Sequence, residues 1–233
     1  LDAEGRRQRQ MGIRDGAHPD AAEAERLFAL CRAEITRLEK VFSLFRSDSA
    51  LTALNRDGRL AGPPLELVSL LSLAGRIHEA TGGAFDPTIQ PLWVLYAEHY
   101  AADPAAKAGP APERIEAALA RTGWRHVESD PSEVRLRAGS ALTLNGIAQG
   151  YITDRIAYLL KAEGMENVLV DIGSIRALGA APTVGSWPVT IRPVLRESLA
   201  GATLRLTSPA PAHPAATAHR FTSPSQPANN HHP

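Results

Sequence analysis

The sequence has little cysteine and no excess of charge of either sign. Its single cysteine, Cys31, excludes a disulfide within one chain. Leu27, Ile35 and Leu38 share its face at helical spacing, so we expect Cys31 to be buried in a helix. Lysine plus arginine and aspartate plus glutamate each number 25, which gives a formal net charge of +0. This balance argues against a general polyanion binder, and we expect no nucleic acid partner.

Long apolar runs are missing as well. No stretch approaches the ~18–20 apolar residues that span a bilayer, and no signal-peptide hydrophobic region is visible. Hydrophobic residues still make up 44% of the 233 residues, and charged residues make up 21%. That proportion is ordinary for a globular protein with one sizeable core.

Periodicity and composition divide the sequence into three parts. Residues 1–18 are polar and show no sustained period, so we interpret them as a ragged N-terminal segment. Residues 19–206 are expected to form the folded domain. Residues 207–233 contain six prolines, four histidines and no acidic residue. Such a composition buries too little apolar surface to offset ordering, and we expect an irregular tail.

Alternating helix and strand signals within 19–206 predict an α+β fold rather than a repeating βαβ array. A hairpin is predicted over 133–144, turning at 138–140, and a short buried strand over 167–173. Helices are predicted where apolar residues recur at helical spacing between start and stop signals, over 19–42, around Leu51 and Leu54, and over 63–83, 112–122 and 148–163.

The segment TGGAFDPTIQPLW (81–93) is the first whose residue types suit ligand binding. Gly82 and Gly83 allow a tight exit from a helix and a close backbone approach to a ligand. Phe85 offers an aromatic face, and Asp86 can accept hydrogen bonds from a heterocycle or a ribose. The same residues also fit a helix end followed by an Asp-Pro turn, and both interpretations stay open.

Two further segments pose similar alternatives. LTLNGIAQGYITD (142–154) places Gly146 where a strand is expected to meet a helix, which suits either a phosphate cradle or a plain tight connection. It matches neither the dinucleotide fingerprint nor the P-loop. In NVLVDIGSIRALG (167–179), Asp171 ends the predicted strand and is either a functional carboxylate or a turn residue.

Four histidines of the tail raise the question of a metal site. They are His213, His219, His231 and His232. The tail supplies no cysteine or acidic partner for them, so we expect no specific metal site there.

Four segments, taken in order, resemble one family, the ApbE-type FAD:protein FMN transferases. They are FSLFRSDSALTALN (42–55), TGGAFDPTIQPLW (81–93), LTLNGIAQGYITDR (142–155) and NVLVDIGSIRALG (167–179). The resemblance covers roughly residues 19–187. It implies a T-fold-like α+β scaffold in which a mixed or antiparallel sheet packs with helices.

The resemblance also implies an activity. Enzymes of this family bind FAD with Mg²⁺ and transfer FMN to a threonine hydroxyl of an acceptor protein, releasing AMP. The acceptors are typically subunits of membrane redox pumps, so the implied location is the periplasm or the outer face of the cytoplasmic membrane, with peripheral membrane association. Some relatives instead hydrolyse FAD to FMN and AMP.

Part of the implied FAD site lies before residue 90. Ala84, Phe85 and Asp86 correspond to a triplet that contacts FAD in the family. Phe45 matches an aromatic position near the flavin that is often tyrosine.

The rest of the implied site surrounds the glycine turn. Thr143 and Gln149 match positions that contact FAD, and Gly146 stands where the family offers a backbone oxygen to Mg²⁺. Position 149 is commonly lysine in the family, so Gln149 removes one positive charge beside the expected diphosphate. No residue is indicated as the catalytic base.

The end of the sequence departs from the family pattern. The family continues to an Asp-Pro-x-Thr-Gly signature whose Asp and Thr complete the Mg²⁺ site, but here no acidic residue follows Glu197. We therefore expect the C-terminal metal-binding part to be missing from this sequence. A truncated, non-catalytic flavin-binding module and an FAD hydrolase are the alternatives to the transferase.

Overall fold

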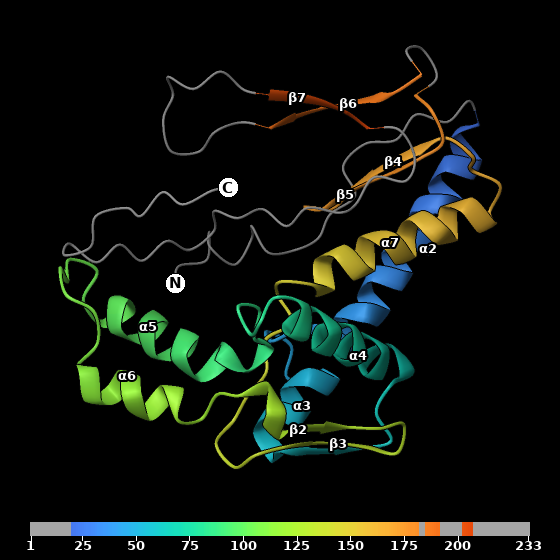
Figure 1. The fold of residues 1–233 in the computed structure, drawn as a ribbon. Helices are drawn as coiled ribbons and strands as arrows, with labels where there is room; N and C mark the ends of the chain where they lie inside the picture. The colour runs from blue at the N-terminus through green and yellow to red at the C-terminus, as the bar shows by residue number, and fades with distance from the viewer. Residues whose placement is uncertain (1–19, 182–184, 192–201, 207–233) are drawn as a thin grey trace.

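The computed structural model describes residues 20–181, 185–191 and 202–206 (Figure 1). The predicted segments 1–18 and 207–233 lie outside the described residues, and the domain limits 19–206 stay a prediction. The helices are α2 (Ala21–Phe42), α3 (Ala50–Asp57), α4 (Leu65–Ala80), α5 (Gln90–Ala102), α6 (Pro112–Leu119) and α7 (Ala148–Ala162), with the 3-10 turns η1 (Pro87–Ile89) and η2 (Trp124–His126). The strands are β1 (Arg59–Ala61), β2 (Val127–Ser129), β3 (Glu133–Leu136), β4 (Val168–Asp171), β5 (Ile175–Leu178), β6 (Trp187–Ile191) and β7 (Ala202–Leu206).

Side-chain caps explain where the first helices begin. The Asp20 carboxylate accepts from the backbone N–H groups of Ala22 and Glu23 at the start of α2. Ser49 caps α3 by accepting from Thr52 N–H at 3.0 Å. These side chains satisfy donors that the first helical turn leaves unpaired. The predicted helices at both positions are confirmed, and Cys31 is buried, with 2% of its surface exposed.

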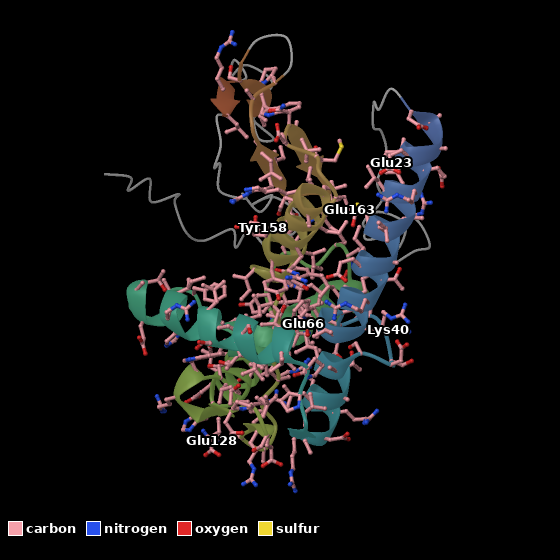
Figure 2. The ribbon with its side chains drawn as sticks, turned by 90° about the vertical axis from the view of Figure 1, so that its right-hand side faces the viewer. Glu23, Lys40, Glu66, Glu128, Tyr158 and Glu163 are labelled. Atoms are coloured by element: carbon pink, nitrogen blue, oxygen red, sulfur yellow. The ribbon has the colours of Figure 1, made fainter. Side chains whose placement is uncertain are left out.

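The main core lies between α2, α3, α4 and α7. Figure 1 shows α2 and α7 side by side and α5 beside α6. Arg26 of α2 joins the two long helices at the surface, because it pairs with both Glu23 and Glu163 at 2.6 Å. Those two carboxylates lie at the same end of the helix pair (Figure 2). The most deeply buried side chains of the core include Leu38, Leu51, Leu54, Leu67, Leu70, Leu142, Leu144, Ile152 and Ile156.

Three small antiparallel sheets accompany the helices, so the α+β class is confirmed. One sheet has the order β1-β3-β2, and β4-β5 and β6-β7 form two-stranded sheets. The predicted hairpin over 133–144 is wrong, because only Glu133–Leu136 is a strand and its hairpin partner is β2. Asp130 makes the actual turn, since its Oδ1 accepts from the backbone N–H groups of Ser132 and Glu133.

The predicted strand over 167–173 forms but is not buried along its length. In β4 only Val170 is buried, while Leu169 is 37% exposed and Asp171 is exposed. Helix α7 packs against this two-stranded sheet, and a strand covered by helices on both faces would be buried more continuously. Helix α5 was not predicted, because its apolar residues are spread around the helix rather than gathered in one stripe. None of the described helices is long and apolar enough to cross a membrane.

Candidate functional site

The segment that contains Gly146 is held from two sides. The Asn55 side chain accepts from Leu142 N–H at 2.7 Å and donates to the Leu142 carbonyl at 2.8 Å. One residue later, Thr143 N–H donates to the Pro87 carbonyl at 2.8 Å. These bonds replace the strand pairing that the alternation of Leu142 and Leu144 predicted. They also join three of the four segments singled out in the sequence.

Phe85 and Gly146 meet where the second and third segments come together. A Cβ placed on Gly146 would lie 3.2 Å from Cε2 of the Phe85 ring, a tight contact. Gly146 does not have a positive φ, so the closeness of the ring, not backbone conformation, favours glycine here. Gly146 is exposed and Phe85 is half-buried. The aromatic face and the glycine turn are therefore direct neighbours.

The backbone of Phe85, at the centre of the triplet Ala84-Phe85-Asp86, is held by hydrogen bonds to His78 of helix α4 and to Thr81, which follows that helix. Phe85 N–H donates to Thr81 Oγ1 at 3.1 Å, and the Phe85 carbonyl lies 2.8 Å from His78 Nδ1. A carbonyl oxygen can only accept, so His78 carries a hydrogen on Nδ1. Ala84 is exposed, and Gly82 and Gly83 have φ values of 58° and 87°, which turn the chain out of α4.

Asp86 forms the turn that was one of its two predicted interpretations. Its Oδ1 accepts from Thr88 N–H at 2.8 Å and from the Thr88 hydroxyl at 2.6 Å, which caps η1. Thr88 Oγ1 in turn accepts from Gly123 N–H at 2.6 Å. No sequence pattern indicated Thr88 or Gly123, because a threonine two residues after an aspartate is common and Gly123 lies outside the four segments.

Gln149 connects the third segment with the fourth. Its Nε2 donates to the Ile172 carbonyl at 2.9 Å, and a Cβ on Gly173 would come within 2.0 Å of that nitrogen. Gly173 also has a φ of 94°. The Gln149 amide thus occupies the space that a side chain at position 173 would need. Thr143, the other predicted contact beside the turn, is half-buried, and its Oγ1 accepts from Asn145 N–H at 3.4 Å.

Phe45 is placed differently from the other candidates. Its side chain is 62% exposed, and its N–H donates to Ser43 Oγ at 3.1 Å. The structure therefore brings together Phe85, Asp86, Thr143, Gly146 and Gln149 through direct or shared neighbours, and leaves Phe45 on the surface.

Two ionisable side chains near the site, those of Tyr151 and Asp171, have surroundings that explain their roles. Burial of Tyr151, whose ring packs edge-on against Phe42 at 5.4 Å, raises the pKa of its phenol above the ordinary value. Tyr151 is therefore a neutral hydroxyl at physiological pH. Asp171 is exposed, and its Oδ1 accepts from Gly173 N–H at 3.1 Å, which fits the turn interpretation.

The described part of the chain does not supply a complete set of ligands for a metal ion. No group of three or more histidine, cysteine, aspartate or glutamate side chains there is arranged to hold one. Magnesium prefers six oxygen ligands in octahedral geometry with carboxylate help. The Gly146 carbonyl is a single candidate ligand, so the described residues by themselves do not fit Mg²⁺.

A family model for the ApbE family matches residues 11–213, which is most of the chain. The chain belongs to the ApbE family. It is 35% identical over 193 residues to the FAD:protein FMN transferase of Treponema pallidum, covering 73% of this chain and 50% of that protein. The corresponding protein of Klebsiella pneumoniae is 29% identical over 188 residues, with 77% and 53% covered.

Solved ApbE structures share the fold. The Pseudomonas stutzeri flavinyl transferase ApbE superposes with a TM-score of 0.69 at 28% identity, covering 84% of this chain and 60% of that one. The ApbE protein of Thermotoga maritima gives a TM-score of 0.70 at 23% identity, covering 82% and 62%. The chain spans about half the length of the curated ApbE relatives it matches.

Proposed function

We propose that this chain carries the FAD-binding part of an FAD:protein FMN transferase. The observation that carries the proposal is the convergence of the four segments on the turn at Gly146. Asn55 and Pro87 hold that turn, the Phe85 ring lies against it, and Gln149 ties it to the Gly173 turn. The names of the relatives, all FAD:protein FMN transferases, supply the chemistry.

In this proposal Ala84, Phe85 and Asp86 contact FAD from one side. Thr143 and Gln149 contact it from the glycine turn. Phe45, whose side chain is 62% exposed, contacts the flavin from outside. The fixed backbone of the triplet means that little freedom is lost when FAD binds, which favours affinity.

The proposed reaction transfers FMN to a threonine of an acceptor protein. The threonine oxygen forms a bond to the FMN phosphorus, the bond from that phosphorus to AMP breaks, and the threonine proton passes to a base or to solvent. Such phosphoryl transfers depend mainly on alignment and charge stabilisation. The proposal includes Mg²⁺ with the Gly146 carbonyl as one ligand, although the described residues do not complete its coordination.

Two other outcomes are built into the test. A flavin-binding module without catalysis is favoured by the missing metal-holding cluster among the described residues. An FAD hydrolase would use the same cofactor site with water in place of threonine.

The decisive experiment incubates the chain with FAD, Mg²⁺ and an acceptor protein that has a threonine flavinylation motif. Flavin fluorescence on the denatured acceptor, together with AMP, supports the transferase. AMP without labelled acceptor indicates the hydrolase, and FAD binding without AMP indicates the non-catalytic module. Absence of FAD binding would overturn the proposal as a whole.

We also propose that the chain acts in the periplasm or on the outer face of the cytoplasmic membrane, in peripheral association with it. Support comes from the family resemblance, because the acceptors of such enzymes lie there. Fractionation of cells that express the natural gene tests this, and recovery of the protein in the cytoplasm alone would contradict it.

A further inference from the structure

Thr88 is almost completely buried and makes three polar contacts. Only 1% of its surface is exposed. Its hydroxyl donates to Asp86 Oδ1 at 2.6 Å, and its backbone N–H donates to the same oxygen at 2.8 Å. The hydroxyl oxygen accepts from Gly123 N–H at 2.6 Å. One side chain therefore connects the carboxylate of Asp86 with a loop that lies 35 residues further along the chain.

These contacts divide the two oxygens of the Asp86 carboxylate. Oδ1 receives both Thr88 donors, whereas no donor within the described residues reaches Oδ2. Asp86 is half-buried, and its Oδ2 is not among the buried side-chain atoms of the described residues that lack a partner, so Oδ2 is accessible to a ligand. A carboxylate whose rotamer is fixed by a charge-assisted hydrogen bond loses less freedom when it binds a ligand donor.

The far end of this connection is itself anchored. Gly123 has a φ of 129° and precedes Trp124, whose ring packs against Gly75 and lies 6.2 Å from the His78 ring. His78 hydrogen-bonds the Phe85 carbonyl. Contacts therefore run from Asp86 through Thr88 to η2, from η2 to helix α4, and from α4 back to the triplet that contains Asp86.

We infer that Thr88 is a positioning residue for the proposed FAD site. It holds Asp86 Oδ1 in the turn and presents Oδ2 to an N–H or O–H donor of FAD. This inference rests on the proposed function, since it requires that the chain bind FAD.

A double-mutant cycle on FAD affinity tests it. Thr88→Val keeps the shape of the side chain and removes the hydroxyl, and we expect FAD to bind about tenfold more weakly, as for loss of a hydrogen bond to a charged group. Thr88→Ser keeps the hydroxyl and should bind FAD within about twofold of the unaltered chain, less than the effect of one hydrogen bond. In an Asp86→Ala background, Thr88→Val should change the affinity by less than about twofold, because the group through which it acts is gone.

Two results would overturn the inference. One is that Thr88→Val binds FAD like the unaltered chain. The other is that Thr88→Val weakens binding equally with and without Asp86, which indicates a general structural effect. Thr122→Val is the matched control, since its hydroxyl donates to the Leu119 carbonyl next to the same loop and does not touch Asp86. It should leave FAD affinity unchanged.

Asp86→Asn decides the matter if Thr88→Val does not fold. The amide oxygen can accept from Thr88, which leaves an NH₂ group where the ligand donor would approach. We expect this variant to unfold at nearly the same temperature as the unaltered chain and to bind FAD at least about tenfold more weakly. Unaltered FAD affinity in this variant would contradict the inference. Failure of the unaltered chain to bind FAD would instead contradict the proposed function.

Discussion

The side chain of Asn55 pairs with Leu142 as a neighbouring strand would, since it bonds to both the N–H and the carbonyl of that residue at 2.7 and 2.8 Å. The two residues are 87 positions apart. Asn55 ends the first segment of the site and Leu142 begins the third. This pair therefore sets the position of the Gly146 turn relative to helix α3.

Asn55→Asp should destabilise the fold while keeping the size of the side chain. A carboxylate can accept from Leu142 N–H but cannot donate to the Leu142 carbonyl, so two oxygens face each other. We expect a loss of about 1–3 kcal/mol in the free energy of unfolding at pH 7. Urea denaturation measures it.

Asn145→Asp is the matched control for that change. Asn145 is exposed, and the same substitution there should change the unfolding free energy by less than about 0.5 kcal/mol. Equal effects at positions 55 and 145 would contradict a special role for the Asn55 pair.

Gly173→Ala should lower the free energy of unfolding more than an ordinary substitution of a glycine at a positive φ. The added Cβ would meet Gln149 Nε2 at 2.0 Å, in addition to the backbone strain at φ 94°. We expect a loss of at least about 2 kcal/mol in unfolding free energy. Combining it with Gln149→Ala removes the obstructing amide and should recover part of the loss.

Gly164→Ala separates the two causes. Gly164 has a similar φ of 89°, and no atom lies within 4 Å of a Cβ built on it. The free energy of unfolding of this variant should fall by only about 1 kcal/mol, because backbone strain is the only cause. If it loses as much as Gly173→Ala, the contact with Gln149 has no energetic consequence.

Gly146→Ala tests whether the contact between the glycine turn and Phe85 matters for the cofactor. A Cβ at 3.2 Å forces the ring to move by a few tenths of an ångström without backbone strain. We expect less than about 1 kcal/mol of destabilisation, but about tenfold weaker FAD binding by fluorescence titration. Gly109→Ala, which places a Cβ 3.6 Å from the Tyr96 ring in ordinary contact, is the control and should keep full affinity.

Glu34 gives the stability a pH dependence. Its carboxylate accepts from Arg37, which lowers the pKa of Glu34, and Arg155 lies 3.6 Å away. Arg37 also pairs with Glu66 at 2.7 Å, where α2 and α4 meet (Figure 2). A carboxyl whose pKa is lowered by folding stabilises above its unfolded pKa of about 4.3. That stabilisation disappears as the pH falls through the lowered folded value.

Glu34→Gln should therefore lower the free energy of unfolding by about 0.5–1 kcal/mol at pH 7 and should not change it well below pH 4. Urea denaturation of both proteins over this pH range measures the difference. Glu25→Gln is the control, because Glu25 pairs with Arg32 but has a side chain that is 72% exposed. A loss that does not vary with pH would contradict the role of the Glu34 charge.

The sequence predicted elements whose signals are local. The helix over 148–163 has an apolar stripe and a terminal glycine, and it formed as predicted. The turn at Asp86 was one of two local alternatives. The hairpin over 133–144 failed because the backbone groups of Leu142 pair with a side chain from a distant helix, which no local pattern reveals.

The sequence indicated candidate residues for the site but not the hydrogen bonds that connect them. Family resemblance indicated Phe85, Asp86 and Gly146, and the structure places the first and last in contact. The roles of Asn55, Thr88 and Gly123 depend on hydrogen bonds across 87 and 35 positions. Such long-range pairs arise only from tertiary packing, which single-sequence patterns do not contain.

In three of the hydrogen-bonded pairs that hold the site together, one residue uses its side chain and the other uses its backbone. Asn55, Thr88 and Gln149 each use a side chain, whereas Leu142, Gly123 and Ile172 each answer with a backbone group. Every amino acid except proline has both backbone groups. In a saturation mutagenesis screen for FAD binding, the first three positions should accept few replacements. The hydrogen bonds themselves place no restriction on the side chains at the other three, whose tolerance is set by packing and backbone conformation alone.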